Sequence, residues 1–171
     1  MKKSVLESKI NDLIVLIQDS FLDVKLENGV SWREAGIISE YGSDEESAIE
    51  RNKDEKNDWQ KIPFILIGNF KYQDALLFLD TLGLKFYLPI CMIYTLKNYK
   101  TSRSMLSNSL ISKLTNKKDA LKLQSILNNN QKICVIRFIS LCLEIGEGYF
   151  NLTKVERRVK EYWIENSETI I

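Results

Sequence analysis

The sequence predicts an all-α fold, organised as a single domain over residues 1–171. Apolar residues recur at spacings of three and four from Leu6 to Phe21, which is typical of one face of an amphipathic helix. Ser31 and Ser43 are each followed three residues later by glutamate, the pattern of a helix-opening capping box. Alternation typical of a strand is confined to a short piece around residues 24–26. We therefore expect an irregular bundle of about six to eight helices.

The expected helices follow from these patterns in chain order. Helix dipoles favour acidic residues in a first turn, and the helix that Ser43 opens has three. Asp58 is suited to cap a short turn that contains Trp59, and Pro63 to start another. Thr153 and Glu156 give a last capping box. The helices are expected at about residues 3–21, 31–42, 43–57, 80–99, 102–115, 117–127, 130–146 and 153–163.

The helix expected at about residues 80–99 is the centre of the predicted bundle. It is hydrophobic on every side around Phe86 and Tyr87, and such helices are usually buried. Asp80 is placed to cap it. Pro89 has no amide hydrogen, so we expect the helix to kink or restart there.

Composition excludes several kinds of chemistry. The chain has no histidine, so a Ser-His-Asp triad, a Cys-His pair and a His-containing zinc site are ruled out. The three cysteines lie in apolar runs, which indicates reduced core residues and a cytoplasmic protein. Charged residues interrupt the N-terminal apolar stretch, and the most apolar window is too short for a bilayer, so no membrane association is expected. Neither a cofactor nor a catalytic residue is predicted.

Several stretches resemble an uncharacterised family of bacterial proteins, described as a domain of unknown function. The signatures are DExxDWxxIP, from Asp54 to Pro63, and Phe-Tyr-Leu-Pro, from Phe86 to Pro89. Gly29-Val-Ser-Trp-Arg-Glu-Ala35 and the closing Tyr162-Trp163 match as well, whereas residues 98–125 match poorly. The resemblance implies a mostly helical fold and no established activity. Small helical families of this kind often resemble immunity proteins that are encoded beside secreted toxins, which is an analogy of fold class only.

The stretch from Glu40 to Asp58 is strongly acidic. It holds eight acids against three bases, a local balance of 3 − 8 = −5. A solvated helix face is the first interpretation, and a surface that captures a basic protein partner is the second. The third is a metal-dependent hydrolase, because the spacing of Glu46, Glu50 and Asp54 would place three carboxylates on one helical face. Trp59 is expected to anchor the run in the core. The candidate partner-binding residues are Tyr41, Glu45, Glu46, Glu50, Asp54 and Glu55.

From Lys97 to Arg137 the sign of the charge reverses. Nine bases face one acid, and serine and asparagine are frequent. A solvated basic face explains this pattern, and nucleic-acid binding is the alternative, since lysines contact phosphates. No nucleic-acid-binding motif accompanies it, and the whole chain carries a net charge of only +1. The candidate residues for this alternative are Lys113, Lys117, Lys118 and Lys122.

Three functions therefore follow, in order of preference. The first is a cytoplasmic, non-enzymatic protein that binds a basic protein partner through its acidic surface, as an immunity-type inhibitor binds a bacterial toxin. The second is a nucleic-acid-associated protein that uses the lysines, and the third is the carboxylate-based hydrolase.

Overall fold

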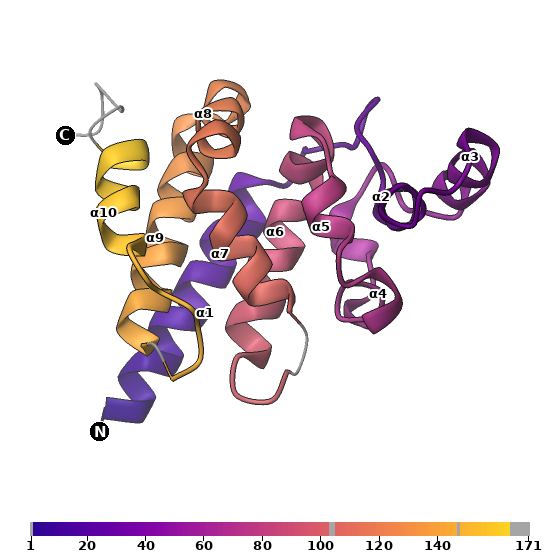
Figure 1. Ribbon diagram of the computed structural model, residues 1–171. Helices are drawn as coiled ribbons and strands as arrows, with labels where there is room; N and C mark the ends of the chain where they lie inside the picture. Colours follow the sequence, from indigo (N-terminus) through magenta and orange to yellow (C-terminus); the bar gives the residue numbers. More distant parts are fainter. Residues whose placement is uncertain (1, 103–104, 147, 165–171) are drawn as a thin grey trace. The chain divides into compact units, whose positions relative to one another are not determined.

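The computed structural model describes residues 2–102, 105–146 and 148–164, and all regular structure in these ranges is helical (Figure 1). This confirms the predicted all-α class. The described residues form ten α-helices, more than the expected six to eight. The excess comes from two very short helices, α4, which follows the turn expected at Pro63, and α5, where no element was expected.

The helices keep the expected order along the chain. The α-helices are α1 (Lys2–Ser20), α2 (Trp32–Ser39), α3 (Asp44–Asn52), α4 (Phe64–Ile67), α5 (Ala75–Phe78), α6 (Thr81–Asn98), α7 (Leu106–Thr115), α8 (Lys117–Ile126), α9 (Asn129–Ile145) and α10 (Val155–Val159). Tighter or wider turns form η1 (Trp59–Lys61), η2 (Phe70–Tyr72) and η3 (Lys160–Ile164). None of these helices is both long and apolar enough to cross a membrane.

Contacts divide the chain into two compact units. Residues 1–22 and 111–171 form one, called the terminal unit here, and residues 23–110 form the other, the middle unit. Because α7 contains both Leu110 and Ile111, it contributes residues to each. The single domain expected from the sequence stays a prediction, and the two units are described one after the other.

The terminal unit is built on α1 and α9, which pack along each other (Figure 1). The Gln131 side chain donates to the Ser20 carbonyl over 3.1 Å, which ties the start of α9 to the end of α1. The Trp163 indole N–H donates to the Leu114 carbonyl over 2.8 Å and holds η3 against α7. The expected capping box at Thr153 is absent: α10 starts after Lys154, which has a left-handed φ of 63° and no side-chain cap bond.

The middle unit has α6 as its buried core. Twelve of its residues are buried, which confirms the predicted buried central helix. The Asp80 carboxylate accepts from the Gly83 amide over 2.7 Å and caps the helix as expected. Of the kink or restart predicted at Pro89, the restart is wrong, since α6 runs through it to Asn98, and the kink stays a prediction. Burial of the residues on both sides of Pro89 outweighs the missing hydrogen bond.

The loop before α2 lies against the first turn of α6. Asp80 also accepts from the Val30 amide, over 3.0 Å, so one carboxylate serves both segments. A Cβ atom added to Gly29 would collide with the Gly83 amide, and one added to Gly83 would collide with the Val30 carbonyl. Both glycines therefore permit a backbone approach that no side chain would allow.

Candidate functional site

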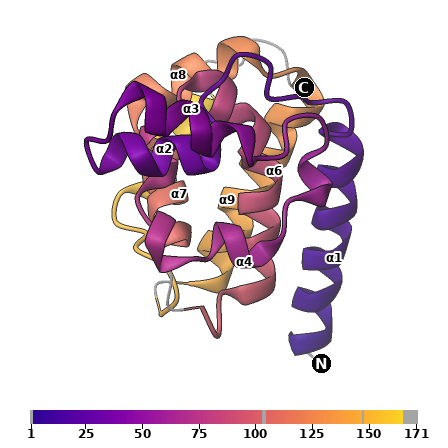
Figure 2. The same cartoon turned by 90° about the vertical axis from the view of Figure 1, so that its right-hand side faces the viewer.

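The acidic run divides at the end of α3 into an outward part and an inward part. The chain from Glu40 to Glu46, which joins α2 to α3, is exposed throughout, and we call it the α2–α3 corner. The two helices lie side by side in both views (Figures 1 and 2). Of the predicted binding residues, Tyr41, Glu45 and Glu46 lie in this corner. Glu50 lies near the end of α3, half-buried and ion-paired with Lys53.

Tyr41 occupies a position in the corner that glycine usually takes. The Tyr41 amide donates to the Ile38 carbonyl over 3.1 Å and the Gly42 amide to the Ile37 carbonyl over 3.0 Å. These two bonds form a Schellman motif, which ends α2 and requires a left-handed residue between them. Tyr41 has a φ of 58° and is 96% exposed. Its ring therefore contributes nothing to the core while its backbone is strained.

The other carboxylates of the corner differ in how they are held. Glu46 forms the second half of a capping box, because its carboxylate accepts from the Ser43 amide over 2.8 Å. The backbone hydrogen bond from Ser43, and then that from its hydroxyl, lower the pKa of Glu46 below its ordinary value. In contrast, Glu40, Asp44 and Glu45 are exposed and make no side-chain hydrogen bond or ion pair with the described residues.

The inward part begins where α3 ends at Asn52. The prediction that the helix continues to about residue 57 is wrong, because turn hydrogen bonds from Lys53 and Asp54 follow Asn52. The Asp54 side chain is only 1% exposed, and the Arg33 guanidinium lies 2.6 Å from its Oδ1. The Arg33 amide donates to Oδ2 over 2.7 Å. Asp54 therefore does not belong to an exposed surface, contrary to the prediction.

This early helix end also removes the geometry of the predicted carboxylate site. Glu46, Glu50 and Asp54 do not share a helical face, because Asp54 lies beyond the helix and turns inward. Glu46 is bound to Ser43, and Glu50 is paired with Lys53. Within the described residues, no group of three potential metal ligands comes together.

Glu55 completes the inward part. Its Oε1 accepts from the backbone amides of Lys56, Asn57 and Asp58 over 2.9, 2.7 and 3.2 Å. The bond from Asn57 is the main cause that lowers the pKa of Glu55 below its ordinary value. Trp59, which follows in η1, is buried as expected, and Asp58 caps that turn.

A polar cavity of about 320 Å³, open to solvent on one side, lies at this inward part, and all its lining residues belong to the middle unit. Ile62, Pro63 and Leu66 form its apolar wall. Its polar lining consists of Arg33, Lys53, Asp54, Glu55, Lys61 and Tyr87. Segments from α2, from the turn after α3, from α4 and from α6 thus meet at one cavity.

Tyr87 brings α6 to this cavity. It is 1% exposed, its ring lies 5.3 Å from that of Trp32, and its hydroxyl accepts from the Trp32 amide over 3.0 Å. Burial, followed by the negative charge of Asp54, raises the pKa of Tyr87 far above its ordinary value, so the phenol keeps its proton. Burial of Arg33 opposes ionisation, but the hydrogen bond and the charge of Asp54 outweigh it and raise the pKa of Arg33.

Sequence reasoning missed Arg33 and Tyr87 as site residues. Both lie inside the stretches on which the family resemblance rests, and so do Asp54 and Pro63. Their position in these stretches was the one feature of the sequence that could have grouped them, because no motif or spacing connects residues so far apart. Only the three-dimensional path of the chain shows that these residues meet at one cavity.

The lysines of the predicted nucleic-acid alternative lie around the turn from α7 to α8 in the terminal unit. Lys113 is mostly buried and 3.5 Å from the Asp119 carboxylate. Lys117, Lys118 and Lys122 are exposed. Arg103, another base of this region, lies outside the described residues.

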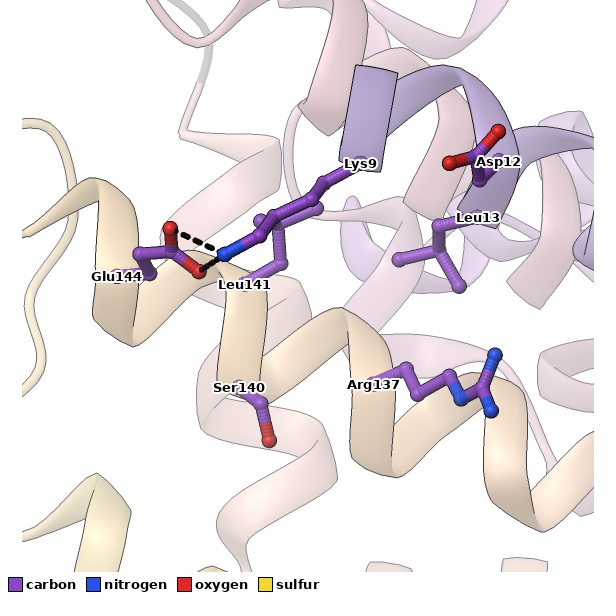
Figure 3. Close-up of a pocket in the computed structure, with 7 residues that line it drawn as sticks. All are labelled: Lys9, Asp12, Leu13, Arg137, Ser140, Leu141 and Glu144. Carbon is purple, nitrogen blue, oxygen red and sulfur yellow. Dashed lines mark hydrogen bonds and ion pairs between the residues drawn. The ribbon is translucent and has the colours of Figure 1, made fainter. Parts of the chain in front are cut away.

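A charged groove of the terminal unit lies between α1 and α9 (Figure 3). The Lys9 ammonium is bound to both oxygens of Glu144, over 2.7 and 2.8 Å. Figure 3 shows the Asp12 carboxylate and the Ser140 hydroxyl pointing in different directions, with Leu13 between Asp12 and Arg137. Because these polar groups do not converge, the groove is best explained as an ion pair across two packed helices.

The fold and these sites define a small all-α protein with an exposed acidic corner and a polar cavity that is open to solvent. The chain belongs to a family of unknown function (DUF6714), whose model matches residues 9–167. No curated protein and no solved structure matches the chain.

Proposed function

We propose that this is a partner-binding protein that docks through its α2–α3 corner on a basic surface of another protein. The observation that carries the proposal is Tyr41, which is 96% exposed and held at a φ of 58°. A tyrosine in a left-handed conformation costs about 1–2 kcal/mol relative to glycine, and this ring recovers none of it by burial. Exposed tyrosines are frequent anchors of protein interfaces, where they fill a pocket of the partner.

The charge around Tyr41 supports a basic partner. Residues 35–50 include five acids and no lysine or arginine. Glu40, Asp44 and Glu45 have no ion pair with the described residues, so their field is directed at solvent. A surface of one sign accelerates capture of a partner of opposite charge and contributes less to holding it. In this proposal the acids set the association rate and Tyr41 sets the lifetime.

The more specific form of the proposal is an immunity-type inhibitor that binds a toxin in the bacterial cytoplasm, without catalysis. It is supported by the small helical fold and by the acidic corner, and it rests on the analogy with immunity proteins. An inhibitor needs only a preformed surface of suitable charge, which the Schellman motif and the Ser43 cap provide by fixing both sides of the corner.

Affinity purification of the tagged protein from the cells that produce it, followed by mass spectrometry, tests this proposal. The variants are Tyr41→Gly and Glu45→Lys, with Asp23→Lys as the matched control, since Asp23 is an exposed acid of the same unit outside the corner. We expect one basic protein in near-equal amount with the parent and with Asp23→Lys. Glu45→Lys should slow its association, and Tyr41→Gly should weaken binding by about 2 kcal/mol.

The stability of Tyr41→Gly separates binding from folding. Glycine adopts the left-handed conformation without strain. The free energy of unfolding of this variant, measured in urea, should therefore be about 1 kcal/mol higher than that of the parent, although the variant binds the partner more weakly. Equal capture by all four proteins would contradict the proposal. If nucleic acid is recovered instead, and is lost on Lys118→Ala or Lys122→Ala, the alternative function through α8 replaces it.

A further inference from the structure

The cavity of the middle unit contains a buried hydrogen-bond donor that no described residue satisfies. The Tyr87 hydroxyl accepts from the Trp32 amide, but its own hydrogen has no acceptor among the described residues. The next amide along the chain, that of Arg33, is bound by Asp54, so the hydroxyl lies beside this carboxylate at the cavity. A buried hydroxyl without an acceptor costs about 1–3 kcal/mol. The site is thus incomplete on its own.

The remaining donors of the cavity are positively charged. Arg33 uses Nη1 for Asp54 and for the Lys53 carbonyl, and its guanidinium also interacts with the Tyr72 side chain. The Lys61 ammonium is only loosely held, 3.5 Å from Asp58. Lys53 pairs with Glu50, which does not line the cavity. A bound group therefore meets mainly donors.

The two carboxylates of the lining are already engaged. Both oxygens of Asp54 accept hydrogen bonds from Arg33, and Oε1 of Glu55 accepts three backbone amides. Three cations and two anions line the cavity, a balance of 3 − 2 = +1. The charge and the free hydroxyl hydrogen call for the same kind of group, an oxygen that accepts hydrogen bonds and carries negative charge.

We propose that this cavity binds the oxyanion of a small metabolite, a carboxylate or a phosphate. The oxyanion accepts the Tyr87 hydroxyl hydrogen and lies between the ammonium groups of Lys53 and Lys61. The apolar part of the metabolite lies on Ile62, Pro63 and Leu66. A volume of about 320 Å³ is at the small end of ligand pockets and limits the ligand to a small molecule. This site does not depend on the α2–α3 corner, and it gives the protein a ligand in addition to a protein partner.

Titration of the ¹⁵N-labelled full chain with sodium phosphate, and separately with sodium acetate, tests the site. Ionic strength is held constant with sodium chloride, so that general screening does not change. We expect saturating amide shifts at Arg33, at residues 53–57, at residues 61–62 and at residues 64–66, with a Kd on the order of 1 mM for a bare ion. The ion that saturates at the lower concentration identifies the head group.

Three variants and one control locate the binding. Lys53→Met and Lys61→Met should each weaken it by about threefold or more, and Tyr87→Phe by about tenfold, the loss of one hydrogen bond to a charged group. Lys25→Met, an exposed lysine of the same unit outside the cavity, should leave it unchanged. If Tyr87→Phe does not fold, because the Trp32 amide loses its acceptor, the two lysine variants decide. Absence of saturation with both ions, or equal affinity in Lys61→Met and Lys25→Met, would overturn the proposal.

Discussion

The acidic residues before and after the end of α3 have opposite environments although the sequence does not distinguish them. Glu45 is exposed and makes no side-chain hydrogen bond or ion pair with the described residues, whereas the Asp54 side chain is 1% exposed and bonded to Arg33 through both oxygens. The difference arises at Asn52, where the helix stops and the chain turns inward. Charge alone therefore does not indicate a surface. Asp54 is followed five residues later by the buried Trp59, and burial of this tryptophan brings the preceding carboxylate toward the core.

The backbone after α3 shows how this inward turn is held. The Leu26 amide donates to the Lys56 carbonyl over 2.9 Å, which fixes the segment to the loop before α2. Arg51, in the last turn of α3, pairs with Glu34 over 2.7 Å and also donates to the carbonyls of Glu27 and Gly29. Two basic residues, Arg33 and Arg51, thus neutralise acids while they join α2, α3 and the loop.

Replacement of Asp54 should have the largest effect of any single change in the acidic run. Asp54→Asn removes the negative partner of a guanidinium that is 27% exposed, and it should lower the free energy of unfolding by about 3 kcal/mol. Glu45→Gln should change it by less than about 0.5 kcal/mol, because this exposed side chain has no hydrogen bond or ion pair with the described residues. Urea denaturation measures both. Similar losses in the two variants would mean that the inward and outward acids do not differ.

A second, smaller comparison sets Ser31 against Ser43, which open α2 and α3 with the same sequence pattern. The Ser43 hydroxyl accepts from the Glu46 amide over 3.2 Å. At Ser31 the Glu34 carboxylate accepts from the Ser31 amide over 2.8 Å, but the buried Ser31 hydroxyl, although placed as in a capping box, makes no hydrogen bond with the part of the chain that the structure describes. Ser43→Ala should therefore cost about 1 kcal/mol, a typical value for an N-cap serine.

Ser31→Ala should cost clearly less than Ser43→Ala. The alanine removes a buried hydroxyl that has no hydrogen-bond partner within the described ranges and retains the Glu34 half of the box. Thermal unfolding of the two variants side by side gives the order. A larger loss for Ser31→Ala would show that its hydroxyl is bonded in solution.

The comparison of the acidic residues also marks the limit of what periodicity predicts. The order of the helices and the caps at Asp58 and Asp80 follow from local patterns, since a cap depends on residues within one turn. The end of α3 at Asn52 does not, because burial of Trp59 and the pairing of Asp54 with Arg33 decide it. For the same reason α6 continues through Pro89, where the local rule predicts an interruption.

The candidate sites divide in the same way. Tyr41, Glu45 and Glu46 are exposed as the sequence indicates, because short-range capping fixes the corner that carries them. The cavity could not be predicted from residue spacing, since Arg33 and Tyr87 are 54 residues apart and no sequence motif includes both. Tertiary contacts join them: the Trp32 amide with the Tyr87 hydroxyl, and Arg33 with Asp54.

The smallest expected effect is the loss at low pH of the stability that Glu55 contributes. The backbone bond from Asn57, with those from Asp58 and Lys56, holds the pKa of Glu55 below its ordinary value of 4.5. A carboxylate with a lowered folded-state pKa contributes stability above the unfolded-state pKa and loses it as the pH falls through the folded-state value. The contribution of Glu55 should therefore be constant from neutral pH to about 4.5 and should decline below that.

Glu55→Gln tests this pH dependence. The variant should be less stable than the parent at pH 7, and the difference should shrink below pH 4.5, because protonation then weakens the same acceptor in the parent. Urea denaturation across this range measures the difference, with Glu45→Gln as the control that lacks the backbone bonds. If the stability difference between the variant and the parent does not change with pH, the negative charge of Glu55 does not contribute to that difference. Glu55 would then stabilise the inward part through its packing and not through its charge. Asp54 would be the acid whose charge distinguishes the inward part of the acidic run from the outward part.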